Sequence, residues 1–243
     1  MTLPDIHQLY GVIEATWPAQ RTRTLGPITL REGHGGGSRV SAATCSGPAS
    51  DDDITAATLA MRNMGQDSLF MIRHGEEAFD SQLDNLGYHI KDPVTLYAAP
   101  LDDLCAALPP ITAFPSWPPL AAQSEVWDQG GIGPRRLAVM DRATAPKTSI
   151  LGRVGDKPAG TVFVAVHDRI AMLHALEIGA GYRRRGLARH LTIACANWAR
   201  DAGATHLTLI TTKANTAANA LYASLGMTVV GHYHYRIKPE PAT

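Results

Sequence analysis

Residues 183–188 read Arg-Arg-Arg-Gly-Leu-Ala and follow directly on the apolar run 170–178. Apolar side chains then recur at helical spacing from Leu187 to Ala202, and Gly203 ends the pattern. A turn from a strand into a helix presents successive backbone N–H groups that bind anions. Because the macrodipole disfavours cations at a helix N-terminus, three arginines there indicate an anionic partner. We predict a pyrophosphate site in this turn.

The elements around the turn can also be predicted from periodicity. The run Thr148–Val154 joins the next apolar run through Gly155–Pro158, which is a hairpin signal. The predicted strands are Thr148–Val154, Thr161–His167, Ile170–Ile178, His206–Thr211 and a last one from Met227 that pivots near Gly231. A short helix is predicted from Asn215 to Leu225.

The spacing Arg-x-x-Gly-x-Ala lies between 176–178 (Leu-Glu-Ile) and the later segments Asn215 and 221–227 (Leu-Tyr-Ala-Ser-Leu-Gly-Met). This combination resembles the GNAT superfamily of N-acetyltransferases, whose pattern is Arg or Gln, two residues, Gly, one residue, then Gly or Ala. The resemblance covers about Gln123 to Lys238. It implies an α/β (α+β) fold, the GNAT acyl-CoA acyltransferase fold, with a mixed, mostly antiparallel sheet flanked by helices. We expect Val126–Arg142 to supply part of the leading strand and helices.

A proline-rich segment divides the chain into two halves. Residues 107–119 contain five prolines, which sustain neither a helix nor an interior strand. We therefore expect an N-terminal domain at 1–105, a linker at 106–120 and a catalytic domain at 121–243.

The two halves align without a gap at one offset. Gly87 falls on Gly226, an offset of 139 (226 − 87), and Gly47 then falls on Gly186. This indicates a tandem arrangement in which the N-terminal half is a degenerate GNAT-like repeat, although two helix-strand units rich in Ala and Leu also align by coincidence. In the N-terminal copy Pro48 removes a phosphate-facing N–H, so the repeat has lost its chemistry.

The resemblance implies a set of residues that bind acetyl-CoA. Ile178 would bond the pantetheine arm through its main chain. The turn that would cradle the pyrophosphate consists of Arg183, Arg184, Arg185, Gly186, Leu187, Ala188 and Arg189. Asn215 would help to bind the cofactor, cap its helix, or do both.

Three side chains are candidates for proton transfer. Tyr222 is either a core residue or, as the resemblance implies, the general acid for the departing thiolate; a phenol stays protonated at neutral pH. Glu177 and His174 are candidates to take the proton of the amine, unless solvent does so. Strand alternation places these two on opposite faces, and His174 also fits a core position.

Two other segments carry polar or flexible residues. In the cluster 232–236 (His-Tyr-His-Tyr-Arg), period two separates the histidines and the arginine from the tyrosines, which predicts a strand with one polar face. The stretch 33–37 (Gly-His-Gly-Gly-Gly) is interpreted as a flexible connection, because no helix start follows it. Trp117 or Trp127 would help to shape the acceptor cleft.

Composition excludes several classes of protein. The chain has 243 residues with 22 basic and 22 acidic side chains, so no cationic excess favours nucleic acid. Three scattered cysteines predict neither disulfides nor a zinc site, and we expect no metal. No apolar run approaches a membrane span of about 20 residues, and we expect a cytoplasmic protein without membrane contact.

The sequence therefore predicts an acetyl-CoA-dependent N-acetyltransferase, with acetyl-CoA as co-substrate. Its acceptor would be a primary amine on a small molecule, a peptide or a protein. The alternative is a non-catalytic acyl-CoA-binding regulatory module. The oligomeric state stays open.

Overall fold

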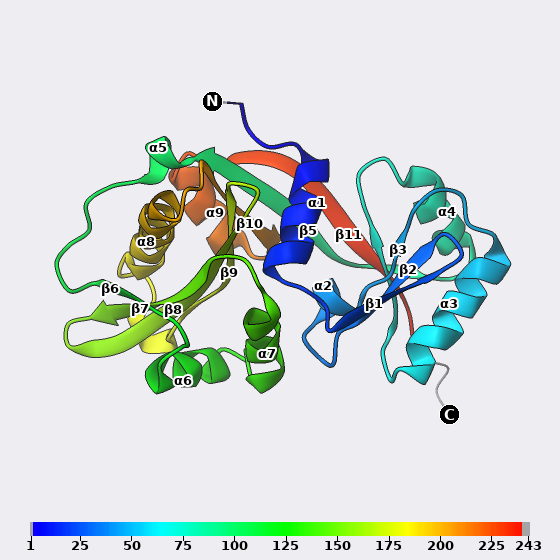
Figure 1. The fold of residues 1–243 in the computed structure, drawn as a ribbon, viewed down its shortest axis with the longest axis horizontal. Coiled ribbons are helices and arrows are strands. Elements are labelled where there is room, and N and C mark those ends of the chain that lie inside the picture. The colour runs from blue at the N-terminus through cyan, green and yellow to red at the C-terminus, as the bar shows by residue number, and fades with distance from the viewer. Residues whose placement is uncertain (1, 240–243) are drawn as a thin grey trace.

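The computed structural model describes residues 2–239, and an eight-stranded sheet extends across the molecule (Figure 1). Its strand order is β4-β11-β5-β10-β9-β8-β7-β6. A smaller sheet, β1-β2-β3, adjoins β4 through a parallel bridge between Ala43 and Phe70. The strands are β1 (Arg21–Leu25), β2 (Ile28–Glu32), β3 (Thr44–Cys45), β4 (Ser68–Ile72), β5 (His89–Pro100), β6 (Ala113–Ser116), β7 (Lys147–Val154), β8 (Lys157–His167), β9 (Ile170–Ile178), β10 (His206–Thr212) and β11 (Thr228–Lys238).

Helices cover both faces of the large sheet. On β8, Val162 and Val164 pack in the cluster that contains the apolar side of α8, whereas Phe163 packs with Trp17 and Trp127 on the opposite face. Strand alternation thus buries both faces of β8. The helices are α1 (Ile6–Thr16), α2 (Ser38–Ser41), α3 (Asp51–Asn63), α4 (Glu77–Asn85), α5 (Leu101–Leu104), the 3-10 turn η1 (Ala180–Tyr182), α6 (Ala121–Gln129), α7 (Pro134–Arg142), α8 (Leu187–Asp201) and α9 (Thr216–Ser224).

The predicted elements of the C-terminal half are confirmed within one to four residues at their ends. Strand β9 and the start of α8 coincide with the prediction, and β11 has its register shift between Val229 and Gly231, where a pivot was expected. The sheet is mixed and mostly antiparallel; β9 and β10 form its parallel pair among the described strands.

The expectation for residues 126–142 was wrong in one respect. These residues belong to two helices, α6 and α7, and contribute no strand. The leading strand is β6, which lies inside the proline-rich segment and pairs antiparallel with β7. Pro115 is tolerated there because β6 is an edge strand and loses no interior ladder bond.

The two halves of the chain exchange strands. Strand β5, which follows α4 in the N-terminal half, lies between β10 and β11 and is antiparallel to both. Strand β11, which follows α9 in the C-terminal half, pairs with β4 of the N-terminal half. Each half therefore completes its sheet with a strand from the other, as the crossing green and red ribbons show (Figure 1).

The offset of 139 relates corresponding elements of the two halves. Adding 139 to the bounds of α4, 77 and 85, gives 216 and 224, which are the bounds of α9. The same shift takes β4 into β10, and takes the start of β5 onto the start of β11. The structure therefore has the same order of helix, strand, helix and strand in both halves.

An ion-pair cluster fastens β11 to α4. The Arg236 guanidinium contacts the carboxylates of Asp80, at 2.7 Å, and Asp84, and it donates to the Tyr88 carbonyl at 2.9 Å. Burial of Asp80 raises its pKa, but hydrogen bonds from Arg236 and from His234 outweigh burial and hold the pKa below its ordinary value. Asp80 thus stabilises the fold above about pH 4, and this contribution is lost as the pH falls through its lowered pKa.

We expect Arg236→Met to lower the free energy of unfolding by about 1.5–3 kcal/mol, because two carboxylates lose a charged hydrogen-bond donor. Urea denaturation at pH 7 measures the change. The matched control is Arg153→Met, whose partner Asp156 is fully exposed, and about 0–1 kcal/mol is expected there. Equal losses in the two variants would contradict a structural role for the cluster.

Candidate active site

A cleft opens where β9 and β10 separate. The two strands pair only from Ile170–Leu173 and His206–Leu209, and beyond that point a cavity of about 830 Å³ lies between β9, the start of α8 and α9. This places the carboxyl end of β9 beside the predicted pyrophosphate turn.

A β-bulge at Ala175 reshapes the wall of the cleft. Ala175 has a φ of +52°, and the pairing with β8 shifts register between Thr161 and Phe163. The Trp127 indole N–H donates to the Ala175 carbonyl at 2.7 Å and holds the bulge in place. The expectation that His174 and Glu177 face opposite ways was wrong, because the extra residue changes the alternation and both line the cleft.

The arginine turn forms one end of the cleft. Arg184 and Gly186 have positive φ angles of 64° and 79°, and α8 begins at Leu187 without a side-chain cap or an acidic residue in its first turn. The first N–H groups of a helix have no intrahelical partner. This end of α8 therefore offers free donors and a positive dipole end to an anion in the cleft.

Most of the predicted cofactor-binding residues line this cleft. They are Ile178, Arg183, Arg184, Gly186, Leu187, Ala188, Arg189 and Asn215. Arg185 does not: its guanidinium lies over the Tyr182 ring, 6.0 Å from the centroid. Asn215 caps α9, accepting from the Ala218 N–H at 3.1 Å, and it also lines the cleft.

The corresponding turn of the N-terminal half is closed to anions. Helix α3 starts with three aspartates, 51–53, and its N-cap Ser50 and Asp53 satisfy each other's N–H groups in a capping box. Two N–H groups at this helix end, those of Ser50 and Asp53, are thus paired internally, and the three aspartates add negative charge there. Leu83, at the position that corresponds to Tyr222, is fully buried in the core.

Tyr222 lies on α9 at the inner wall of the cleft. The residue is 4% exposed, and burial raises the pKa of its phenol above the ordinary value, so the hydroxyl stays protonated at neutral pH. Its ring lies 5.7 Å from that of Tyr97 on β5, whose hydroxyl donates to Asn219 at 3.0 Å. Among the described residues, no hydrogen bond engages the Tyr222 hydroxyl, which is left available to a ligand.

Glu177 is paired rather than free. Its carboxylate lies 3.1 Å from the Arg183 guanidinium, which also donates to the Ile178 carbonyl at 3.1 Å. Gly130, at the end of α6, leaves room for the Glu177 side chain, since a Cβ there would lie 2.5 Å from Cγ of Glu177. Glu177 thus sits at a fixed place in the cleft wall.

His174 is held as a neutral ring. Arg39 donates to its Nδ1 at 2.9 Å, and its Nε2 lies 2.9 Å from the Thr16 hydroxyl, which in turn donates to the Val12 carbonyl. Burial, and then the charge of Arg39, lowers the pKa of His174 well below its usual value. Because the arginine occupies the Nδ1 lone pair, this ring has no free lone pair for a proton from a substrate.

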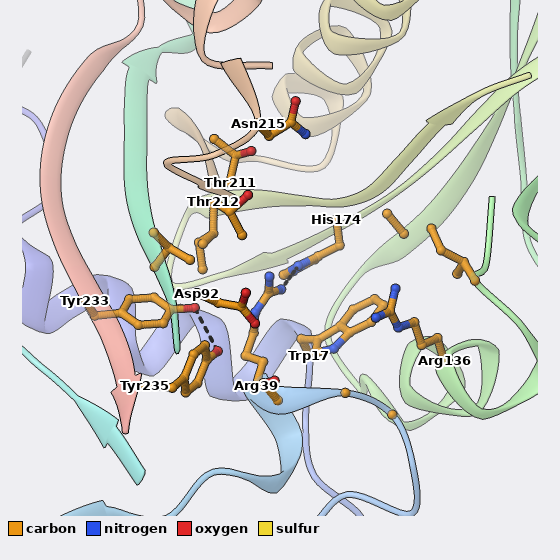
Figure 2. A pocket seen from close by; sticks show the side chains of 17 residues that line it. Trp17, Arg39, Asp92, Arg136, His174, Thr211, Thr212, Asn215, Tyr233 and Tyr235 are labelled. Carbon is orange, nitrogen blue, oxygen red and sulfur yellow. Dashed lines mark hydrogen bonds between the residues drawn. The ribbon is translucent and has the colours of Figure 1, made fainter. Parts of the chain in front are cut away.

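A second cavity of about 320 Å³ adjoins the first (Figure 2). The cavities meet at the bulge, since both are lined by Arg39, His174, Ala175, Ile210, Thr211 and Asn215. The N-terminal half supplies a large part of the second wall: Trp17, Gly36, Gly37, Ser38, Arg39, Asp92 and Val94.

Sequence reasoning missed this contribution of the N-terminal half. The tryptophan in the wall is Trp17, whereas Trp117 and Trp127, which were expected there, do not line the second cavity. The stretch 33–37 is a packed loop and not a flexible connection: Gly36 is buried, and a Cβ there would lie 2.6 Å from a Val139 methyl group of α7. The run of small residues was the signal for this close approach.

In residues 2–239, no group of three or more His, Cys, Asp or Glu side chains is placed to hold a metal ion. No helix in this part of the chain is long and apolar enough to cross a membrane.

Comparisons with known sequences agree with this geometry. Residues 114–227 match the model of the acetyltransferase (GNAT) family. Over 254 residues the chain is 25% identical to "Uncharacterized N-acetyltransferase YobR" of Bacillus subtilis (strain 168), covering 97% of this chain and 100% of that protein.

Solved structures share the fold over both halves. A GCN5-related N-acetyltransferase from Kribbella flavida matches with a TM-score of 0.73 and 17% identity, covering 96% of this chain and 95% of the other. A tandem GNAT protein from the clavulanic acid biosynthesis pathway matches with a TM-score of 0.58 and 13% identity, covering 97% of this chain and 88% of the other. The N-terminal half thus also resembles the GNAT fold. Residues 114–227 are thus a domain of the GNAT family of acetyltransferases, and this domain together with the N-acetyltransferase relative supports an acyltransferase.

Proposed function

We propose that this chain transfers the acetyl group of acetyl-CoA to a primary amine. One observation carries the proposal: a cleft with an uncapped helix end and a protonated tyrosine opens into a second, polar cavity. A donor in the first cavity and an acceptor in the second would meet at the bulge, where positioning alone lowers the barrier.

The chain's own residues supply the binding of the donor. The free N–H groups of α8 and the guanidinium groups of Arg184 and Arg189 match the two charges of a pyrophosphate. Gly186 and Ala188 carry little bulk that would keep a phosphate from the backbone. By family resemblance, Ile178 bonds the pantetheine arm through its main chain.

Tyr222 is proposed as the general acid. In the reaction the amine nitrogen bonds to the acetyl carbon, the carbon–sulfur bond breaks, and the sulfur takes a proton. The buried, protonated phenol of Tyr222 donates that proton and is then restored from solvent.

Glu177 is proposed as the group that accepts the proton of the amine, directly or through water. His174 is unsuited to this role, because Arg39 already occupies its acceptor nitrogen. Glu177 lines the cleft close to the bulge, and its ion pair with Arg183 keeps the carboxylate in place.

Arg184→Ala is expected to weaken acetyl-CoA binding roughly 10-fold to 100-fold, because one charged hydrogen bond to the pyrophosphate is lost. Isothermal titration calorimetry measures the dissociation constant. Arg185→Ala is the matched comparison, since the structure places its side chain over Tyr182 and outside the cleft. A folded wild-type protein that binds no acetyl-CoA would refute the proposed function.

Tyr222→Phe is expected to reduce kcat roughly 100-fold or more while acetyl-CoA affinity is retained, because only the proton donor is removed. Thiol release over a panel of primary amines measures turnover. A non-catalytic acyl-CoA-binding module predicts tight binding without thiol release in either protein. An unchanged kcat in the variant would show that Tyr222 acts in packing alone.

Glu177→Gln is expected to lower kcat roughly 100-fold near neutral pH. The deficit should shrink as the pH rises toward the pKa of the acceptor amine, because more of the amine then arrives without its extra proton. The kcat profile between pH 6 and 10 tests this. A deficit that is the same at every pH, or no deficit, would indicate that solvent takes the proton.

A further inference from the structure

The second cavity holds an uneven set of charges. Two guanidinium groups, Arg39 and Arg136, and one carboxylate, Asp92, line it together with the hydroxyl-bearing side chains of Tyr233 and Tyr235 (Figure 2). His174, the remaining ionisable group of the wall, is neutral because its pKa is lowered. The cavity therefore has a net positive charge, from two cationic groups and one anionic group.

Arg39 is fixed by its surroundings. One of its terminal nitrogens donates to His174 at 2.9 Å, and the guanidinium lies 5.8 Å from the centroid of the Trp17 ring. Its Nε is buried and has no hydrogen-bond partner among the described residues. A buried donor without a partner is unfavourable.

Arg136 lies at the opposite side of the cavity on α7, and its side chain is exposed. Two of its guanidinium nitrogens lie 3.6 Å from the position that a Cβ on Gly37 would take, so the guanidinium lies against the glycine loop. Among the described residues it makes no ion pair. It is an unneutralised cation that faces the same space as Arg39.

Asp92 supplies the opposite charge. It lies on β5 with a φ of +44°, an uncommon conformation for a residue other than glycine, and its exposed carboxylate has no hydrogen-bond partner among the described residues. Figure 2 shows it between Tyr233 and Arg39. A free carboxylate at this place attracts an ammonium group.

We propose that the acceptor is a small zwitterion, an amine that carries a carboxylate as an amino acid does; this rests on the proposed acetyl transfer. Arg39 and Arg136 bind the carboxylate, and Asp92 draws in the ammonium group. The volume of about 320 Å³ is at the small end of ligand pockets and suits a ligand of this size. Polyamines, which carry several positive charges and no carboxylate, are disfavoured by the two arginines.

The proposed reaction also changes the net charge of the acceptor. The ammonium group loses one proton before attack and a second as the amide forms, while the leaving sulfur takes up one. The acceptor thus enters as a zwitterion and leaves as an anion. Asp92 then faces a ligand without a positive charge, which favours release of the product.

The test compares each α-amino acid with its carboxamide, which has almost the same size but no carboxylate. Thiol release with acetyl-CoA gives kcat/KM, and thermal shift of the CoA-saturated protein gives binding of the same compounds. At least one amino acid is expected to exceed its carboxamide roughly 10-fold to 100-fold in kcat/KM, mainly through KM, as expected for a charged hydrogen bond.

Arg136→Met is expected to reduce that ratio toward one without loss of the fold, since the side chain makes no ion pair in the described structure. Arg39→Lys keeps the positive charge but loses the planar guanidinium group that can donate two parallel hydrogen bonds. It should partly lower the ratio of kcat/KM between amino acid and carboxamide. Arg135→Met is the matched control: it is a neighbouring exposed arginine on α7 that does not line the cavity, and the ratio should be unchanged.

The outcomes separate this proposal from the proposed function. Carboxamides that react as fast as the amino acids, an unchanged ratio in Arg136→Met, or no reaction and no binding of any amino acid would each overturn the zwitterion proposal. Calorimetry with acetyl-CoA on the same preparation tests the proposed acetyl transfer separately. Binding of acetyl-CoA together with turnover of other amines would support acetyl transfer, and absence of binding would refute it.

Discussion

The hydrogen-bonded position of β5 between β10 and β11 is the constraint on which the rest of the structure depends. Pairing runs from His206 with Pro100 to Thr212 with Val94 on one side, and β11 pairs along the other. The N-terminal half cannot separate from the C-terminal half without breaking both ladders. Because β5 also extends to Asp92 and α1 packs over β8 and β9, this exchange brings N-terminal residues to the wall of the second cavity.

The local features of the C-terminal half could be predicted because their signals lie within short stretches of sequence. Periodicity and Gly203 predicted α8, and the apolar run predicted β9. Other features depend on partners far away in the chain. Strand β6 exists because an edge position next to β7 tolerates Pro115, and the bulge at Ala175 is held by Trp127 from α6. The residues that adjoin Pro115 and Ala175 in the sequence do not indicate either partner.

The same contrast applies to the candidate site, where the sequence predicted the arginine turn but not the second cavity. Glycine and arginine at fixed spacing identified the turn, since the backbone conformation of Gly186 requires that residue. The second cavity was missed because its walls come from Trp17 after α1 and from α2, β5, α7, β9, β10 and β11, which only the exchanged sheet brings together. The glycines at 35–37 carried the available signal. This signal could be interpreted only from the structure, in which the side chains of Val139 and Arg136 on α7 lie against these glycines.

The two halves differ at their corresponding helix starts, yet they contact each other at the ring of His174. Helix α3 of the N-terminal half is capped by its own Ser50 and Asp53, whereas α8 of the C-terminal half has no side-chain cap. Helices α1 and α2 of the N-terminal half supply Thr16 and Arg39, which bracket His174 of the C-terminal half. Burial and the adjacent charge of Arg39 lower the pKa of His174 and keep its ring neutral. The neutral ring in turn accepts a hydrogen bond from Arg39, which orients the guanidinium. Removing either partner leaves a buried polar group unsatisfied, which costs about 1–3 kcal/mol. The N-terminal half therefore orients a cation in the wall of a cavity that it shares with the C-terminal half.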